Sequence, residues 1–515
     1  MKRINILMLI FLTCFALAAW PQAQTQTKYQ QYKLYDLGPL PPQFGGGPDS
    51  ILSFFVISVT KKGVIGGAQT AASDPFDPNC LGPAIYDMIQ TGCYVTHAFL
   101  WNNGIPTDLG AFPGHHGNNS SLANAINNEG VIAGMAENGH VDPDTGYPET
   151  RAVVWDKGKI RNLGTLGGTQ SNAMDVNDLG QVVGGALNRT DDSLSAGFVL
   201  GFGFMWPGTT QVRAFVWQNG VMRDLGTLGG PDAFAISINQ FGQIAGQSYT
   251  NSKPNDTTGI PTVDPFLWSN GKMIDLGTLG GTVGYSIWLN DWGQVVGNSD
   301  LAGDVYSHGF LWDRGVLRDL RPPANGGNYS WTYWINELGE VVGGATLSGD
   351  ELNDAMLWRF GKPIDLGAIG EDVCSEATGM NDFGQIVGIS NECSGSWDPS
   401  GWATMRAFLW QKGSPMVDLN ALVEENPSNL HLFWGAYIND SGEILAQGVL
   451  STGDIHAALL VPSGDCKEDC ERRIVASQNT PDARANAGSP SPAFGKQAKW
   501  LHHRLGQRYA LPGQN

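Results

Sequence analysis

The sequence has little charge for its length, and positive charge is the scarcer sign. Lys and Arg together number 30, against 49 Asp and Glu in 515 residues, which gives a formal net charge of −19. This shortage of basic residues argues against nucleic acid as a partner, because binding to phosphates needs Lys and Arg. Charged residues are only 15% of the chain, which excludes a coiled coil, since long exposed helices need far more charge.

Long hydrophobic runs are missing from the sequence except at its start. Residues 4–20 are predominantly apolar, follow two basic residues and include small residues near their end. This order is typical of a secretory signal peptide, which we assign to residues 1–23, followed by an N-terminal linker at 24–32. An uncleaved membrane anchor is the alternative. We therefore expect a secreted chain, periplasmic or extracellular, with no membrane span after cleavage of the signal.

Cysteine is sparse, and its seven copies include Cys14, which lies in the expected signal peptide. The remaining cysteines are even in number, which in an exported protein indicates disulfides. A zinc site is less favoured, because the short Cys-x-x-Cys spacing and a nearby His are both missing. Proximity in the sequence favours three pairs, although other connectivities remain open: Cys80 with Cys93, Cys374 with Cys393, and Cys466 with Cys470.

Glycine and tryptophan, in contrast, are abundant, with 69 Gly and 17 Trp. The glycines have no strict period of three, which excludes a collagen, and the aromatic content excludes an acidic disordered chain. This composition is typical of many short strands joined by glycine turns.

One unit recurs through the chain, most clearly in the copies that begin at Arg151, Arg213 and Asp264. Each copy holds four strand-length pieces: an Ala-Phe-Leu-Trp type, a piece ending in Asp-Leu, a piece ending in Ile-Asn, and a Val-Val-Gly type. Trp-x-x-Gly joins the first two pieces and Asn-x-x-Gly joins the last two, both in the pattern of tight hairpin turns. Four antiparallel strands per unit, repeated along the chain, predict the blades of a β-propeller.

Counting the turns gives the number of blades. Thr60 to Gly63 fills the place of an Asn-x-x-Gly turn near the N-terminus, and seven such turns follow, at Asn127, Asn177, Asn239, Asn290, Asn336, Asn381 and Asn439. The N-terminus supplies the last three pieces of a unit and the C-terminus supplies the first. Pairing residues 35–37 with 458–461 would complete a final blade and remove the open edges. We predict an all-β, eight-bladed propeller at 33–465, closed by its two ends; seven blades with one degenerate unit is the alternative.

These pieces resemble the HAF-repeat family of extracellular repeat proteins, which is named for a His-Ala-Phe opening. The chain has this opening at His97, Ala98 and Phe99, and the resemblance covers residues 33–465. It implies a secreted repeat protein, but it implies no activity, so no catalytic residue can be carried over.

The alternation of strand direction in a blade places both kinds of tight turn on one face of the ring, here called the turn face. The longer and more variable connectors lie on the opposite side, here called the loop face. Insertions gathered on one face usually mark a binding surface, so we expect binding on the loop face. Its candidate contacts are aromatics expected to be exposed, which alternatively pack a core within the loops: Trp206, Tyr249, Tyr306, Trp397 and Trp402.

Two sets of acidic residues are candidates for special roles. Asp142 and Asp144 precede a glycine as in the opening of a calcium loop, with Glu149 as a later ligand; solvated acidic loops are the alternative. No other cofactor is expected. The Asp before Leu recurs in nearly every copy and Asn162 replaces it once, which indicates a structural hydrogen-bond acceptor rather than a catalytic acid.

Together these features favour a non-catalytic binding or scaffold module for an extracellular glycan or protein partner. The alternative is a carbohydrate-active enzyme, a hydrolase or lyase, with a site at a central pocket; perturbed carboxylates near the axis would favour it. Residues 466–515 are expected to be a linker and a basic tail, largely disordered. Within them, 496–511 is basic and amphiphilic, and docking onto the acidic body or an anionic cell surface is the alternative.

Overall fold

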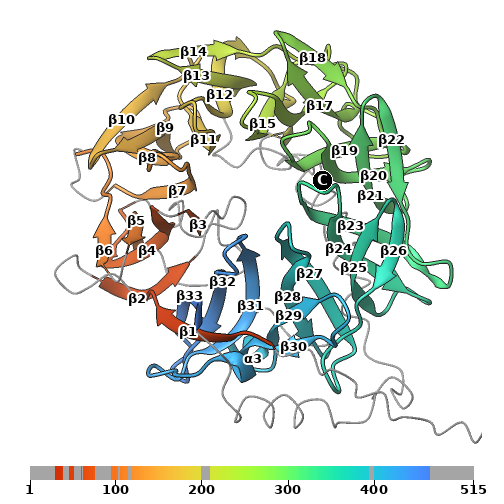
Figure 1. The fold of residues 1–515 in the computed structure, drawn as a ribbon. Helices are drawn as coiled ribbons and strands as arrows, with labels where there is room; N and C mark the ends of the chain where they lie inside the picture. The colour runs from red at the N-terminus through yellow and green to blue at the C-terminus, as the bar shows by residue number, and fades with distance from the viewer. Residues whose placement is uncertain are drawn as a thin grey trace, which may run out of the picture.

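The computed structural model describes residues 29–38, 46–51, 59–60, 62–75, 94–102, 105–113, 119–195, 197–198, 209–393 and 399–463. Strands dominate this part of the chain, with short helical turns at α3 (Pro399–Trp402) and η2 (Leu419–Leu422). None of the helices described there is long and apolar enough to cross a membrane. Figure 1 shows the sheets arranged in a ring around a central axis, so the chain is an all-β propeller.

The strands follow the four-piece repeat along most of the chain. The first half of the ring holds these strands: β2 (Gly46–Ile51), β3 (Val59–Thr60), β4 (Gly63–Ser73), β5 (Tyr94–Asn102), β6 (Ile105–Asp108), β7 (Ser121–Ile126), β8 (Ile132–Val141), β9 (Pro148–Asp156), β10 (Lys159–Gly164), β11 (Ser171–Val176), β12 (Val182–Asp191), β13 (Thr210–Gln218) and β14 (Val221–Asp224). They form three antiparallel sheets, β2–β6, β7–β10 and β11–β14, and β3 pairs with β4 beside the main path of its sheet.

An eight-stranded sheet comes next, and its two halves meet through a single parallel pair, Val263 with Val283. Two four-stranded sheets, β23–β26 and β27–β30, follow it. The strands of these three sheets are β15 (Ala233–Ile238), β16 (Ile244–Tyr249), β17 (Val263–Ser269), β18 (Lys272–Asp275), β19 (Gly280–Leu289), β20 (Val295–Leu301), β21 (Ser307–Asp313), β22 (Val316–Leu320), β23 (Gly326–Ile335), β24 (Val341–Leu347), β25 (Asn353–Arg359), β26 (Lys362–Asp365), β27 (Cys374–Met380), β28 (Gln385–Asn391), β29 (Arg406–Gln411) and β30 (Val417–Asp418).

The last sheet joins the two ends of the described chain, as predicted. Its order is β1 (Gln31–Asp36), β33 (Ile455–Ser463), β32 (Ile444–Val449) and β31 (His431–Ile438). β1 is antiparallel to β33, with Tyr35 opposite Leu459 and Asp36 opposite Ala458, and the two strands lie side by side in Figure 1. The expected pairing of 35–37 with 458–461 is therefore confirmed. β1 begins two residues before the boundary expected at 33.

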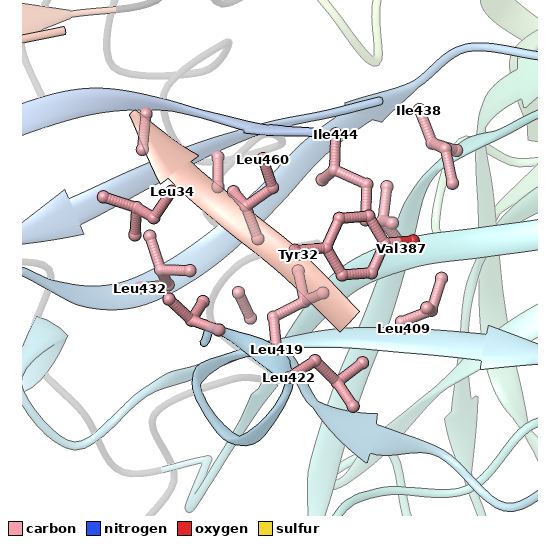
Figure 2. Packing of buried hydrophobic residues seen from close by; sticks show 14 of the residues in the cluster. Tyr32, Leu34, Val387, Leu409, Leu419, Leu422, Leu432, Ile438, Ile444 and Leu460 are labelled. Atoms are coloured by element: carbon pink, nitrogen blue, oxygen red, sulfur yellow. The ribbon is translucent and has the colours of Figure 1, made fainter. Parts of the chain in front are cut away.

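Tyr32 anchors this closing strand in a large apolar cluster. Its side chain is fully buried between the closing sheet, the neighbouring β27–β30 sheet and η2 (Figure 2). Leu34 and Leu460 pack in the same cluster, as do Leu419 and Leu422 of η2. Closure of the ring thus rests on apolar burial as well as on the β1–β33 backbone hydrogen bonds.

Both kinds of tight turn lie at the same edge of a sheet, as the register of β11–β14 shows. Val182 pairs with Val176 across the Asn-x-x-Gly turn and with Trp217 of the next strand, which enters the Trp-x-x-Gly turn. The glycine of the Val-Val-Gly piece is required because the neighbouring strand's backbone approaches it too closely to leave room for a side chain. A Cβ on Gly246 would lie 2.1 Å from the carbonyl oxygen of Phe234.

The asparagines of the turns tie neighbouring repeats together. Within its own turn, the Asn239 Oδ1 accepts hydrogen bonds from the backbone N–H groups of Phe241 and Gln243, which confirms the expected turn role. Its Nδ2 also donates, at 3.1 Å, to the carbonyl oxygen of Asn290 in the next repeat, which forms the other half of the eight-stranded sheet. The same bond recurs from turn to turn: Asn127 to Asn177, Asn177 to Asn239, Asn290 to Asn336, Asn336 to Asn381 and Asn381 to Asn439.

Candidate functional site

The Asp that ends the second piece has a structural role. Asp108 Oδ1 accepts a 2.7 Å hydrogen bond from the backbone N–H of Gly110, and Asp224 does the same for Gly226 at 2.8 Å. Asn162 makes the equivalent bond, which explains why it can replace Asp. In several sheets a histidine at the start of the first piece pairs with this Asp: His97 with Asp108, His308 with Asp319, and His456 with Asp36.

In two repeats an aspartate stands in the place of this histidine, Asp264 in β17 and Asp354 in β25. Asp264 of β17 faces Asp275 of β18, and burial together with repulsion from Asp275 raises the pKa of Asp264 to about 7. We expect Asp264→His to raise the free energy of unfolding at pH 7.5 by about 1–2 kcal/mol, because it replaces a buried like-charge contact with a charge-assisted hydrogen bond. Urea unfolding measures this. Asp264→Asn is the control and should give a smaller gain; a loss with histidine would contradict the assignment.

The aromatics expected on the loop face do not form one exposed surface. Tyr249 and Trp402 are buried, so their expected exposure is wrong. Tyr249 packs against Phe198 at 4.8 Å, and Trp402 stacks on Phe433 at 5.5 Å, so both fill apolar clusters beneath the loops. Tyr306 remains 39% exposed and contacts Tyr329 edge-on. Trp206 and Trp397 lie outside the described residues.

Two of the three expected calcium ligands, Asp142 and Glu149, use their carboxylates in other hydrogen bonds. Asp142 is buried, and its Oδ1 accepts the backbone N–H of Asp144 at 2.9 Å. Glu149 Oε2 accepts from Asn138 at 2.8 Å and from Arg151 at 2.7 Å. These contacts stabilise a turn and a pair of strands. Across the described part of the chain, no group of three or more His, Cys, Asp or Glu is placed to hold a metal ion.

Among the cysteines, the expected pair Cys374–Cys393 forms a disulfide. It joins the start of β27 to the connector after β28, and both residues are buried. Cys80, Cys93, Cys466 and Cys470 lie outside the described residues.

Polar and aromatic side chains come together on the inner strands of the ring, a location that the sequence pattern did not predict. β19, β23 and β27 are the first strands of three successive four-strand groups and lie at the inner side of the ring in Figure 1. They carry what we call the axial cluster, a set of side chains that retain partial solvent exposure although they lie within the ring: Tyr285, Trp331, Tyr333 and Glu376.

The centre of the axial cluster is a hydrogen bond between two strands. Tyr333 Oη of β23 donates to Glu376 Oε2 of β27 at 3.1 Å. Although Glu376 keeps partial exposure, its place deep within the ring desolvates the carboxyl and raises its pKa to about 7, opposed by the Tyr333 hydroxyl and the Trp331 indole. Desolvation within the ring, together with the nearby Glu376 carboxylate, raises the pKa of Tyr333 well above its ordinary value. Glu376 is therefore poised to change its charge near neutral pH, while Tyr333 stays a hydrogen-bond donor.

The geometry around this pair is held by its neighbours. Asn298 Oδ1 accepts the backbone N–H of Thr332 at 2.9 Å, and its Nδ2 donates to Tyr285 Oη at 3.3 Å. A register shift between Thr332 and Trp334 interrupts the usual alternation of β23. The same shift recurs at the equivalent place in β11, β15 and β27, so the bulge is a feature of the repeat.

A second aromatic group lies closer to the turn face. Trp288 of β19 stacks on Trp334 of β23 at 4.5 Å, and Trp334 meets Tyr437 of β31 edge-on at 5.4 Å. β31 belongs to the closing sheet, so this aromatic layer reaches past β27. Gly379 of β27 leaves room for it, because a Cβ there would lie 3.1 Å from the Cα of Tyr437.

Comparison with models of protein families and with curated proteins finds no match. Among solved structures, the chain is similar to the β-propeller domain of the trilobed protease from Pyrococcus furiosus, at 12% identity and a TM-score of 0.39, over 72% of this chain and 96% of that one. It is also similar to dipeptidyl peptidase 4 from Porphyromonas gingivalis (10% identity, TM-score 0.35, 69% of this chain and 54% of that one). A third is an oligogalacturonate lyase in complex with manganese (10% identity, TM-score 0.36, 65% and 86%). Similarity at this level assigns neither a family nor an activity.

Proposed function

We propose that this protein is a secreted, non-catalytic binding module of the HAF-repeat family, built as a closed ring of eight blades. The blade count treats the eight-stranded sheet as two blades, because only one parallel residue pair joins its halves. The signal-like start of the sequence supports export, and the Cys374–Cys393 disulfide fits an oxidising compartment.

The ligand that suits the axial cluster is a saccharide segment of an extracellular glycan. Aromatic rings such as Trp331 and Tyr285 offer apolar faces to the C–H faces of a sugar ring, and Glu376 and Tyr333 offer an acceptor and a donor to its hydroxyl groups. The single observation that carries this proposal is the Tyr333–Glu376 hydrogen bond among partly exposed aromatics on neighbouring inner strands.

Access to this cluster is proposed from the loop face. The aromatic layer of Trp288, Trp334 and Tyr437 lies between the cluster and the tight turns, because each of its members is two residues before a turn asparagine. The loop-face insertions vary most between repeats, and they would add contacts to a longer glycan or to a protein partner.

Catalysis on the same glycan is the second candidate, because the pKa of Glu376 near 7 suits a general acid or base. Glycoside hydrolases, however, ordinarily use a pair of carboxylates. In the described residues the axial cluster contributes one, Glu376, so binding is the function that this geometry supports best.

A glycan-array screen of residues 24–515, with and without EDTA and scored for both binding and cleavage, tests the proposal. We expect binding without cleavage, unaffected by EDTA. Trp331→Ala and Glu376→Gln should each weaken it by roughly tenfold, the effect of losing an aromatic contact or a charge-assisted hydrogen bond. Trp292→Ala, an exposed tryptophan on the turn face, is the matched control and should bind as the unaltered protein does.

The possible outcomes separate the candidates. Cleaved product that disappears with Glu376→Gln would replace the binder by an enzyme. Binding that is unchanged in both axial variants would place the ligand elsewhere. Loss of binding in EDTA would mean that a metal ion takes part.

A further inference from the structure

The turn face carries a crescent of exposed apolar side chains that the binding proposal does not use. The third residue of the Asn-x-x-Gly turn is large and apolar in five successive turns, and each of these side chains is 63–76% exposed: Leu179, Phe241, Trp292, Leu338 and Phe383. Exposed apolar groups in one contiguous patch usually mark an interaction surface. Their common turn position places them along one arc of the ring.

Acidic residues alternate with these apolar ones. The second residue of the same turns is Asp178, Asp291, Glu337 or Asp382, with Gln240 in one turn, and the next turn adds Asp440. Burial and repulsion from neighbouring carboxylates raise the pKa of both Glu337 and Asp382. None of the seven Asn-x-x-Gly turns contains Lys or Arg. We call the five apolar residues together with these carboxylates the turn-face crescent. A binding partner that complements it would carry both positive charge and apolar side chains.

The crescent is pre-organised by hydrogen bonds between turns. Asp382 Oδ1 accepts the backbone N–H of Glu337 at 2.8 Å, and Asp440 Oδ1 accepts that of Asp382 at 2.9 Å. The Trp292 indole N–H donates to the Glu337 carbonyl oxygen at 3.0 Å. The asparagine bonds described above join the same turns. An occupant would therefore meet a surface whose geometry is already set, which lowers the entropic cost of binding.

The last described strand, β33, ends on this same face. Ile444, just after the Asn439 turn, pairs with Leu460 of β33, and Pro462 lies against that turn, since a Cβ on Gly442 would be 3.4 Å from its Cγ. Residues 464–495 connect this point to the basic segment 496–511. A coil of that length has an average span of roughly 30 Å, which is enough to reach the neighbouring turns.

The sequence of that segment complements the crescent. From 496 onward it has four basic residues and no Asp or Glu: Lys496, Lys499, Arg504 and Arg508. Trp500, Leu501, Leu505 and Tyr509 are interleaved with them. We propose that residues 496–511 of the same chain dock on the turn-face crescent, with their apolar side chains on its apolar residues and their basic side chains on its carboxylates. A tethered segment acts at a high effective concentration, so modest affinity suffices.

Zero-length carbodiimide crosslinking of the full mature chain, read by mass spectrometry, tests this directly. Lys496 and Lys499 should become linked to crescent carboxylates such as Glu337 and Asp382. The yield should fall roughly tenfold in Trp292→Ser/Phe383→Ser, because two aromatic contacts are removed. High salt should reduce it as well. Tyr306→Ser, an exposed aromatic replaced on the loop face, is the matched control and should keep the full yield.

Three results would overturn the proposal. The lysines could link only to loop-face carboxylates such as Glu351, or to none. The yield could be unchanged in the double variant, although circular dichroism shows that it is folded. Finally, in a mixture of ¹⁵N-labelled and unlabelled protein, links that join the two isotopes would show that the segment docks on a second copy. The outcome is independent of glycan binding at the axial cluster, which lies on other residues.

Discussion

Replacing Tyr32 by alanine will lower the free energy of unfolding by about 3–5 kcal/mol, the range for deleting a large buried aromatic side chain. Tyr32 is fully buried, and its ring contacts residues of the closing sheet, the preceding sheet and η2. A cavity at this point weakens the attachment of β1, which is the N-terminal contribution to the closing sheet. Loss of that strand would expose the edge of β33. The effect should therefore exceed that of an aromatic change within a single blade.

Urea unfolding followed by tryptophan fluorescence measures this effect, and Tyr32→Phe is its matched control. The Tyr32 hydroxyl is buried without a hydrogen-bond partner among the described residues. Removing it should leave stability unchanged or slightly higher, since an unsatisfied polar group is lost. A small effect of Tyr32→Ala, or a large loss with Tyr32→Phe, would argue against the packing described here.

Stability will rise as the pH is lowered from about 8 to about 5.5, contrary to the behaviour of most paired carboxylates. Burial raises the pKa of six carboxyl groups to values between about 6 and about 8: Glu137, Asp175, Asp232, Asp264, Asp300 and Glu376. In this window the folded state binds protons that the unfolded state, with pKa values near 4, does not. The free energy of unfolding therefore falls as the pH rises through these values.

Two carboxyl groups with a lowered pKa have the opposite effect on the free energy of unfolding, but only at lower pH. His456 and backbone contacts keep the pKa of Asp36 below its ordinary value despite burial, and His308 and Arg321 do so for Asp319. Stability from these groups is present above their unfolded pKa and is lost only as the pH falls below about 4. The maximum should lie between the two ranges, on the acidic side of neutrality.

Thermal unfolding at a series of pH values measures this dependence, and Asp232→Asn provides the control. Asp232 Oδ1 accepts from Ser195 Oγ at 2.7 Å and from the Val212 N–H at 2.9 Å, and asparagine can keep both bonds without the charge. The variant should show a smaller slope between about pH 5.5 and about pH 8. A melting temperature that falls on acidification over this range would contradict the burial of these groups.

The main features of the fold could be predicted from the repeat, because the structure of each piece is determined by residues within that piece. Asn239 and Gly242 define a hairpin through side-chain and backbone bonds within one turn, so the turn can be identified without knowledge of the rest. The incomplete unit at each end then predicted the pairing of β1 with β33. The hydrogen bonds from one turn asparagine to the turn of the next repeat were not predicted, because they depend on the distance between neighbouring repeats in the folded ring.

The candidate site was less accessible to sequence reasoning. The search favoured aromatics in insertions, but Tyr249 and Trp402 are buried because loops of this size need an apolar core of their own. The axial cluster depends on which side chains of the inner strands face the axis, and the bulge beside Thr332 alters that alternation. A signal was present nonetheless. The third piece of the repeat that contains β23 includes Trp331, Tyr333 and Trp334. It is far more aromatic than the third pieces around Ala173 and Ala235.

Disulfide trapping between β1 and β33 tests ring closure most directly. Lys33 is directly opposite Val461 in the antiparallel register, so Lys33→Cys/Val461→Cys places two cysteines within bonding distance. Mild oxidation should form this crosslink in nearly every molecule, and mass spectrometry of the linked peptides should identify it. Lys33→Cys/Ser463→Cys, a diagonal pair, should crosslink far less. Absence of the first crosslink, or equal yields from both pairs, would contradict a ring closed by its two ends.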